Sequence, residues 1–165
     1  MAMINVVLVG TNTLFRQGLR RLLDPSQFSV VGEARDLAAL ATLLEEDGAP
    51  DLVVADLNGC YDDDVDSLRG LRAAYEDIRF VVLANELRLA EIARLLKAGA
   101  DGYLVNELSA EAFSLSLLLV MKGEKALPST LASVLANHSG MPATAPSSWR
   151  TEDQSRRGRA VVMGA

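Results

Sequence analysis

The chain has 165 residues, half of them hydrophobic, which is enough for one well-formed core and too few for two ordinary domains. A net charge of −6 argues against a nucleic-acid surface on the main body, because neutralising phosphates requires clustered lysine and arginine. The apolar runs are too short to span a bilayer and the first residues lack the basic region of a secretory signal, so we expect a cytoplasmic location without membrane contact. Cys60 is the single cysteine, which excludes an intramolecular disulfide and a cysteine-based zinc site.

Short aliphatic runs alternate with amphipathic segments along most of the chain. The first strand is predicted over residues 4–9, and the first helix begins near the capping residues 11–13 and ends before Asp24-Pro25. Further strands are predicted over residues 28–34, 51–57, 78–83 and 102–105, and further helices over residues 36–46, 64–76, 86–98 and 109–122. Five strand-helix units in succession predict an α/β fold, with a five-stranded parallel sheet and helices on both faces.

The pattern changes after residue 124. Pro128, followed by hydroxyl residues and then by Leu131, Val134 and Leu135, predicts a short extra helix within residues 125–137. Residues 138–165 contain mainly Gly, Pro, Ser, Thr and Arg with little periodic apolar content, so we expect a linker or a disordered tail. Four arginines against two acidic residues give this tail a charge of +2, so residues 1–137 carry −8.

Ligands of an open parallel sheet gather beyond the carboxyl ends of its strands. The loops of interest are therefore at residues 10–12, 56–64, 84–86 and 106–108. Asp56 follows the buried run 52–55, so its carboxylate is expected at the rim of the sheet. An acidic residue in that place requires an explanation.

Several motifs, in matching order and spacing, resemble receiver domains of the LuxR/NarL type of bacterial response regulator. They are VVLV followed by LFRQGL near the N-terminus, PDLVVADL at residues 50–57, KAGADGYL at residues 97–104, and Gly123-Glu124 with Leu127-Pro128. The resemblance covers about residues 3–137, with the receiver domain expected over residues 3–124. It implies a flavodoxin-like fold, with the five-stranded parallel sheet and helices on both faces. It also implies a phosphorelay signal-transduction module of a two-component transcriptional regulator, not an enzyme.

The resemblance also implies a phosphorylation pocket of five positions. In the family, an acidic pair and the acceptor aspartate hold a magnesium ion, while a hydroxyl and a lysine on the next two strands contact the phosphoryl group. The acidic pair corresponds here to Gly10 and Thr11, the acceptor to Asp56, the hydroxyl to Ala84 and the lysine to Asn106. Because four positions lack the usual chemistry, we expect no cofactor, weak or lost magnesium binding, and an Asp56 that is weakly phosphorylated or inactive.

Alternatives remain for the acidic residues. Asp56 is either an acid satisfied by loop amides, or a conventionally phosphorylated or otherwise ligand-binding residue. The run 62–64 with Asp66 is expected to be a solvated loop rather than a metal cluster, with Asp64 as the N-cap of the following helix. A small flavodoxin-like enzyme or nucleotide binder is a further alternative, weakened by the lack of a phosphate-binding loop and of a nucleophile with its base.

Two features point to contacts with other proteins. Tyr103 falls where the family places an aromatic whose rotation accompanies activation, although ordinary packing also explains it. Leu115, Leu118 and Leu119 form a second apolar stripe on the last main helix, which either the short helix near Leu131 covers or a homodimer interface uses. A sensor kinase or other regulatory protein is the other expected partner. In this family a linker joins the receiver to a helix-turn-helix domain, so we expect DNA contact only through a domain missing from this chain.

Overall fold

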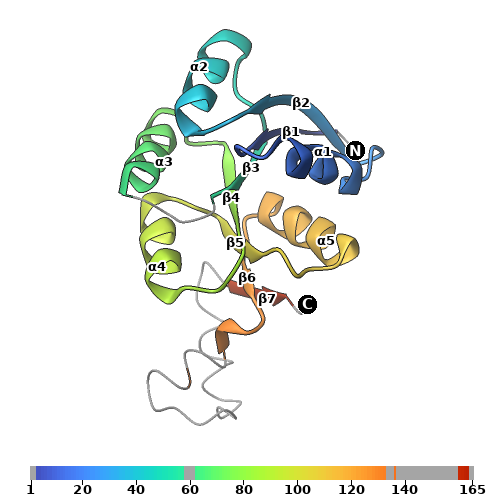
Figure 1. The fold of residues 1–165 in the computed structure, drawn as a ribbon, viewed down its shortest axis with the longest axis vertical. Helices are drawn as coiled ribbons and strands as arrows, with labels where there is room; N and C mark the ends of the chain where they lie inside the picture. The colour runs from blue at the N-terminus through green and yellow to red at the C-terminus, as the bar shows by residue number, and fades with distance from the viewer. Residues whose placement is uncertain (1–2, 58–61, 133–135, 137–159, 164–165) are drawn as a thin grey trace.

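A computed structural model of the protein describes residues 3–57, 62–132, 136 and 160–163, the last four by their backbone alone. One parallel sheet runs through the centre, with helices against both faces (Figure 1). The strands are β1 (Ile4–Val9), β2 (Phe28–Ala34), β3 (Leu52–Asp56), β4 (Arg79–Ala84), β5 (Gly102–Val105), β6 (Lys125–Pro128) and β7 (Ala160–Met163). The helices are α1 (Thr13–Leu22), α2 (Leu37–Asp47), α3 (Asp62–Ala74), α4 (Leu89–Ala98) and α5 (Ala110–Met121). Within these described ranges, we find no helix with the length and apolar content needed to cross a membrane.

The strand order is β2-β1-β3-β4-β5-β6-β7. The first five strands in this order follow the flavodoxin-like arrangement 2-1-3-4-5, so the predicted fold is confirmed. All neighbouring strands pair in parallel. Their carboxyl ends therefore meet at one edge of the sheet, where the functional loops were expected.

Two hydrophobic cores lie on opposite faces of the sheet. Helices α1 and α5 cover one face, and α2, α3 and α4 cover the other (Figure 1). Alternate residues of a strand serve the two cores: Val53 and Ala55 pack under α2–α4, whereas Leu52 and Val54 pack under α1 and α5. This double burial explains why the strands are continuously apolar in sequence.

The sheet has two strands more than the five predicted. Residues 125–128, expected to belong to a short helix, form β6. The extended conformation places Ala126 in the α1/α5 core and Leu127 in the opposite core, which neighbouring helical residues would not achieve. Leu131 and Ala132 are helical, whereas Val134 and Leu135 lie outside the described residues. Within the predicted tail, Ala160–Met163 form β7 beside β6.

The acidic run after β3 was predicted wrongly. Helix α3 includes Asp62, Asp63 and Asp64 in its first turn, so these residues are not a loop and Asp64 is not the N-cap. Carboxylates near a helix N-terminus interact favourably with its free N–H groups and dipole, which favours an earlier start. Asp62 also forms an ion pair with Arg94 of α4.

A charge cluster around the buried carboxylate of Asp101 joins the amino-terminal ends of β4, β5 and β6. Asp101 is 6% exposed, and its Oδ2 accepts hydrogen bonds from Arg72 Nη2 at 2.6 Å and from the Phe80 N–H at 2.9 Å. Lys125 Nζ lies 3.2 Å from Asp101 Oδ1, and Arg79 Nη1 lies 3.9 Å from the same oxygen. Arg72 also donates to three backbone carbonyls and stacks over the Phe80 ring. The cluster lies at the opposite end of the sheet from Asp56 and ties α3 to three strands.

Candidate functional site

The carboxyl ends of the strands bring together residues that are far apart in sequence. Gly10 follows β1 and lies against Asp56 at the end of β3, so closely that a Cβ at position 10 would be 3.2 Å from the Asp56 Cβ. On the next strands, Asp56 is in register with Leu83, and Ala84 with Val105. Ala84 is 4% exposed and presents only a methyl group, and the Asn106 N–H donates to its carbonyl at 3.0 Å.

Asp56 is a partly buried carboxyl group with incomplete hydrogen bonding. Its Oδ1 is buried, and among the described residues it has no hydrogen-bond partner. Burial raises the pKa of Asp56 above the usual carboxyl value. Loop amides supplied by the described residues therefore do not satisfy this oxygen, while residues 58–61 of the adjoining loop, including Cys60, lie outside the description.

The raised pKa predicts a pH-dependent effect of replacing this carboxyl group. Because the folded protein binds this proton more tightly than the unfolded chain, ionisation of Asp56 lowers the free energy of unfolding as pH rises above the ordinary value of 3.8. Asp56→Asn is therefore expected to raise stability at pH 7, with the gain shrinking towards pH 3.5. Urea unfolding at both pH values measures the difference, with the exposed Glu45→Gln as control. A gain that is equal at both pH values would contradict the assignment.

The loop after β1 is held by an arginine that sequence reasoning missed. Asn12 caps α1 by accepting the Phe15 N–H at 3.0 Å, and one turn later the Arg16 guanidinium donates to the Gly10 carbonyl. Arg16 Nε also pairs with Glu33 at 3.0 Å, as does Arg20 at 2.7 Å. The hydrogen bond from Arg20, reinforced by Arg16, holds the pKa of Glu33 below its usual range. The sequence contained one signal for this contact: Arg16 follows Asn12 by four residues, which places both on one face of the helix.

An amide pair bridges the loops after β4 and β5. Asn106 Nδ2 donates to Asn85 Oδ1 at 2.6 Å, which connects the two loops directly beyond the strand ends. Asn106 occupies the position for which the resemblance implies a lysine, and its amide carries no positive charge. The pair therefore supplies a polar connection at this rim without adding a cation.

Tyr103 connects β5 to the start of α4. Its side chain is 1% exposed, and its hydroxyl donates to the Glu86 carbonyl at 2.9 Å and approaches a Glu91 carboxylate oxygen at 3.4 Å. Helix α4 begins at Leu89, three residues later than predicted, and its N-cap residue Arg88 makes no side-chain capping bond. The Tyr103 hydroxyl therefore contacts the segment that precedes α4, at the Glu86 carbonyl.

The residues at the rim do not suit the magnesium ion that the resemblance implies. Magnesium is usually held by one or two carboxylates together with phosphate and water. Gly10 has no side chain, Thr11 contributes at most an exposed neutral hydroxyl, and Asp56 is the one carboxylate among the five pocket positions. Across the described residues, no group of three or more acidic, histidine or cysteine side chains is arranged to hold a metal.

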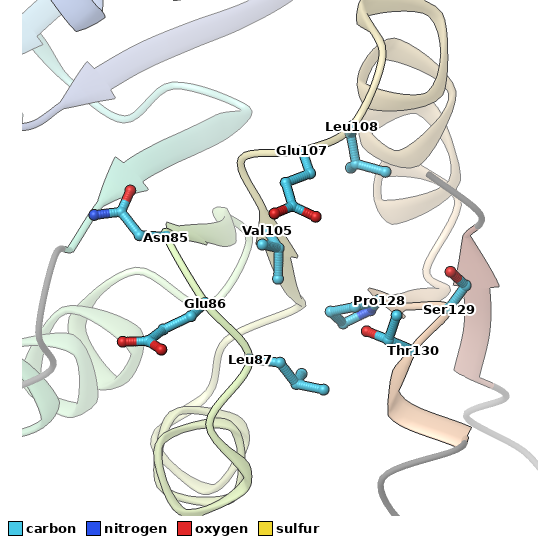
Figure 2. Close-up of a pocket in the computed structure, with 9 residues that line it drawn as sticks. All are labelled: Asn85, Glu86, Leu87, Val105, Glu107, Leu108, Pro128, Ser129 and Thr130. Atoms are coloured by element: carbon cyan, nitrogen blue, oxygen red, sulfur yellow. The ribbon is translucent and has the colours of Figure 1, made fainter.

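A small pocket of about 190 Å³ lies beside these loops. It opens between the β4–α4 loop, the β5–α5 loop and the residues that follow β6, and Figure 2 shows Leu87 pointing towards Pro128 and Thr130 across it. Val105 and Leu108 add apolar surface, and Asp56 does not line it. The pocket is therefore separate from the carboxylate.

The second apolar stripe of α5 stays partly uncovered in the described structure. Leu115 is 47% exposed, and Leu118 and Leu119 are partly buried. Leu131 begins the segment that was expected to cover this stripe, but it packs into the core under α2–α4, on the other face of the sheet. The described part of that segment therefore does not cover Leu115.

Comparison with known proteins agrees with the fold and the motifs. The response regulator receiver domain family matches residues 6–116. The transcriptional regulatory protein DegU of Brevibacillus brevis is 31% identical over 122 residues, which make up 73% of this chain and 51% of that protein. The nitrate/nitrite response regulator protein NarL of Escherichia coli is 30% identical over 132 residues, 79% of this chain and 61% of that protein.

A solved structure gives the same result. The signal receiver domain of the response regulator NarL from Mycobacterium tuberculosis superposes with a TM-score of 0.67 at 26% identity, covering 74% of this chain and 99% of that domain. The matched region spans only about half to two thirds of the length of the curated relatives. These relatives are signalling proteins, and the chain belongs to the response regulator receiver domain family, with relatives of the NarL/LuxR type.

Proposed function

We propose that this receiver works without phosphorylation and acts through protein contacts in a two-component pathway that regulates transcription. The observation that carries the proposal is the set of residues around Asp56. Its Oδ1 is buried without a hydrogen-bond partner among the described residues, and its side chain lies against Gly10. The end of β4 presents the methyl group of Ala84, and the loops beyond β4 and β5 present an uncharged amide pair. Phosphoryl transfer depends on neutralising the charge of the phosphoryl oxygens, and these groups supply neither a metal site nor a cation.

A small phosphodonor tests the proposal directly. Incubation of the full chain with acetyl phosphate and magnesium is expected to leave its intact mass unchanged, whereas a receiver with all five pocket residues should gain one phosphoryl group. A stoichiometric adduct that disappears in Asp56→Asn would overturn the proposal and favour the alternative, a conventionally phosphorylated receiver. The triple variant Thr11→Asp, Ala84→Thr and Asn106→Lys is the matched gain-of-function control, because it returns three of the missing groups while leaving the crowded Gly10 in place.

We propose that the pathway includes contacts with DNA and with a kinase. The DNA contact is not assigned to the surface of the residues that the structure describes. The curated relatives are longer than the matched region. One of them is named a transcriptional regulatory protein, and another is named a nitrate/nitrite response regulator protein. The net charge of −6 disfavours a nucleic-acid surface on this receiver. We therefore assign DNA binding to a separate domain, with a sensor kinase or another regulatory protein as the receiver's partner.

We also infer that α5 provides a homodimer interface. Leu115 is exposed on the stripe with Leu118 and Leu119, and burying such leucines in a contact between two copies is favourable. Light scattering at increasing protein concentration is expected to show a rise in mass that Leu115→Glu abolishes. Val31→Glu is the control, because Val31 is exposed to a similar extent but lies on β2. A strict monomer at every concentration would remove this inference.

A further inference from the structure

The small pocket beside the β4–α4 and β5–α5 loops plays no part in the function proposed for this receiver. It lies at the carboxyl-terminal edge of the sheet, where open parallel sheets bind their ligands, and Asp56 does not line it. Its volume of about 190 Å³ corresponds to roughly six water molecules, which is below the 300 Å³ or so of the smallest drug-sized sites. The space therefore suits a compact ligand.

Apolar side chains line the inner part of the pocket. Leu87, Val105 and Leu108 are partly buried, so each keeps some apolar surface open to the space between them. Leu87 points across the pocket towards the buried Pro128 (Figure 2). A short hydrocarbon chain that covered this surface would remove it from water, which is favourable. The body of the ligand is therefore expected to be apolar.

The carboxylate of Glu107 is directed into this apolar space. Figure 2 shows it over Val105, whereas the side chain of Glu86 points away from the pocket and pairs with Arg88 at 2.7 Å. Among the described residues, the Glu107 carboxylate has no hydrogen-bond or ion-pair partner, and no lysine or arginine lines the pocket. Residues 1–137 carry a net charge of −8, which also attracts cations. The polar end of the ligand is therefore expected to be positively charged.

The loop that carries Glu107 is held in place by its neighbours. The Leu108 N–H donates to the Val105 carbonyl at 3.4 Å, which closes a turn with Glu107 inside it. Asn106 ties the same loop to the end of β4 through its backbone N–H and to the β4–α4 loop through its side-chain amide. A carboxylate on an ordered loop costs less conformational entropy when it binds a ligand. The position of Glu107 therefore favours binding.

We propose that this pocket binds a compact alkylammonium group, with the ammonium on Glu107 and the alkyl chain against Leu87 and Val105. An ammonium group has three donors, and the hydroxyl groups of Ser129 and Thr130 lie across the pocket from Glu107 as further acceptors (Figure 2). A free amine and the lysine side chain of a partner protein share this chemistry. The site is independent of phosphorylation, so the two proposals fail or succeed separately.

Amide NMR spectra of the full, ¹⁵N-labelled chain test the site. The probe is n-butylammonium chloride at pH 7, with sodium chloride added to hold the ionic strength constant. Saturable shifts are expected for residues 86–87, 105–108 and 129–130, which line or carry the pocket. Ammonium chloride and 1-butanol each offer one half of the chemistry of the probe, so both should bind at least about fivefold more weakly. Shifts that do not saturate, or that lie elsewhere, would overturn the site.

A pair of glutamate variants tests the role of the carboxylate. Glu107→Gln should weaken the binding of n-butylammonium at least about fivefold, because a charge-assisted hydrogen bond becomes a neutral one. Glu45→Gln is the matched control, since it makes the same change of charge at an exposed residue of α2 that does not line the pocket. Equal affinities in the two variants, or 1-butanol binding as tightly as n-butylammonium, would overturn the assignment of an ammonium ligand.

A lysine derivative distinguishes the two sources of the ammonium group. Nα-acetyl-lysine N-methylamide carries the same chain and charge on a peptide-like backbone. Binding within about fivefold of n-butylammonium would assign the pocket to a lysine side chain of a partner protein, because the backbone then fits outside the opening. Weaker binding of this derivative, with n-butylammonium still bound, would assign the pocket to a free amine. Both results support an alkylammonium site.

Discussion

Replacing Asp101 with alanine (Asp101→Ala) is expected to lower the free energy of unfolding by about 2–3 kcal/mol, because a buried carboxylate with charge-assisted hydrogen bonds is lost while its partly exposed partners stay in contact with water. The side chain of Asp101 is 9% exposed and lies among Arg72, Arg79 and Lys125. Its loss leaves three neighbouring cations without their shared anion and the Phe80 N–H without its carboxylate acceptor. Urea unfolding monitored by circular dichroism measures the change.

An exposed ion pair provides the control for this prediction. Asp66 pairs with Arg69 at 3.2 Å on α3, but both side chains are more than half exposed. Asp66→Ala should change stability by less than about 0.5 kcal/mol, because solvent screens such pairs. Asp101→Asn should fall between the two variants, since an amide oxygen can still accept the Phe80 N–H. A loss below about 1 kcal/mol for Asp101→Ala would contradict the role of the cluster in holding the strand ends together.

The second large effect is expected at Tyr103. Tyr103→Ala should lower the free energy of unfolding by about 3–5 kcal/mol, because it empties a fully buried aromatic site. It should also loosen the segment around Glu86, whose carbonyl accepts the tyrosine hydroxyl at 2.9 Å. Hydrogen exchange of residues 85–92 measures this local effect separately from global stability.

Tyr103→Phe separates packing from positioning. It keeps the ring and removes the hydrogen bond, so the expected loss of stability is about 1 kcal/mol. Faster exchange at residues 85–92 in this variant would show that the hydroxyl positions the loop before α4. Exchange equal to that of the natural protein would reduce Tyr103 to a packing residue, which is the alternative that its sequence position left open.

The candidate site divides into residues that motifs could identify and contacts that they could not. Asp56, Ala84 and Asn106 each follow or end a strand with a clear apolar pattern, so their place at the rim follows from the parallel topology. The guanidinium of Arg16 on the Gly10 carbonyl and the Asn106–Asn85 pair could not be predicted in the same way. Each contact depends on side-chain conformation and on the path of a loop. The hydrophobic periodicity of the sequence carries no information about either.

Hydrophobic periodicity along the chain was sufficient for the first five strand-helix units and for a parallel sheet covered on both faces, because burial on two faces imposes a regular pattern on every strand and helix. The pocket positions came from the resemblance to receiver domains, and their assignment stays a prediction. The tertiary structure decided what lies at the margins: β6 and β7 at the end of the sheet, the earlier start of α3, and the packing of Leu131 on the face opposite α5. Strands β6 and β7 are four residues long, like β5, but they lie outside the alternation of strands and helices that identified β5 in the sequence. They become strands because a neighbouring edge supplies their hydrogen bonds.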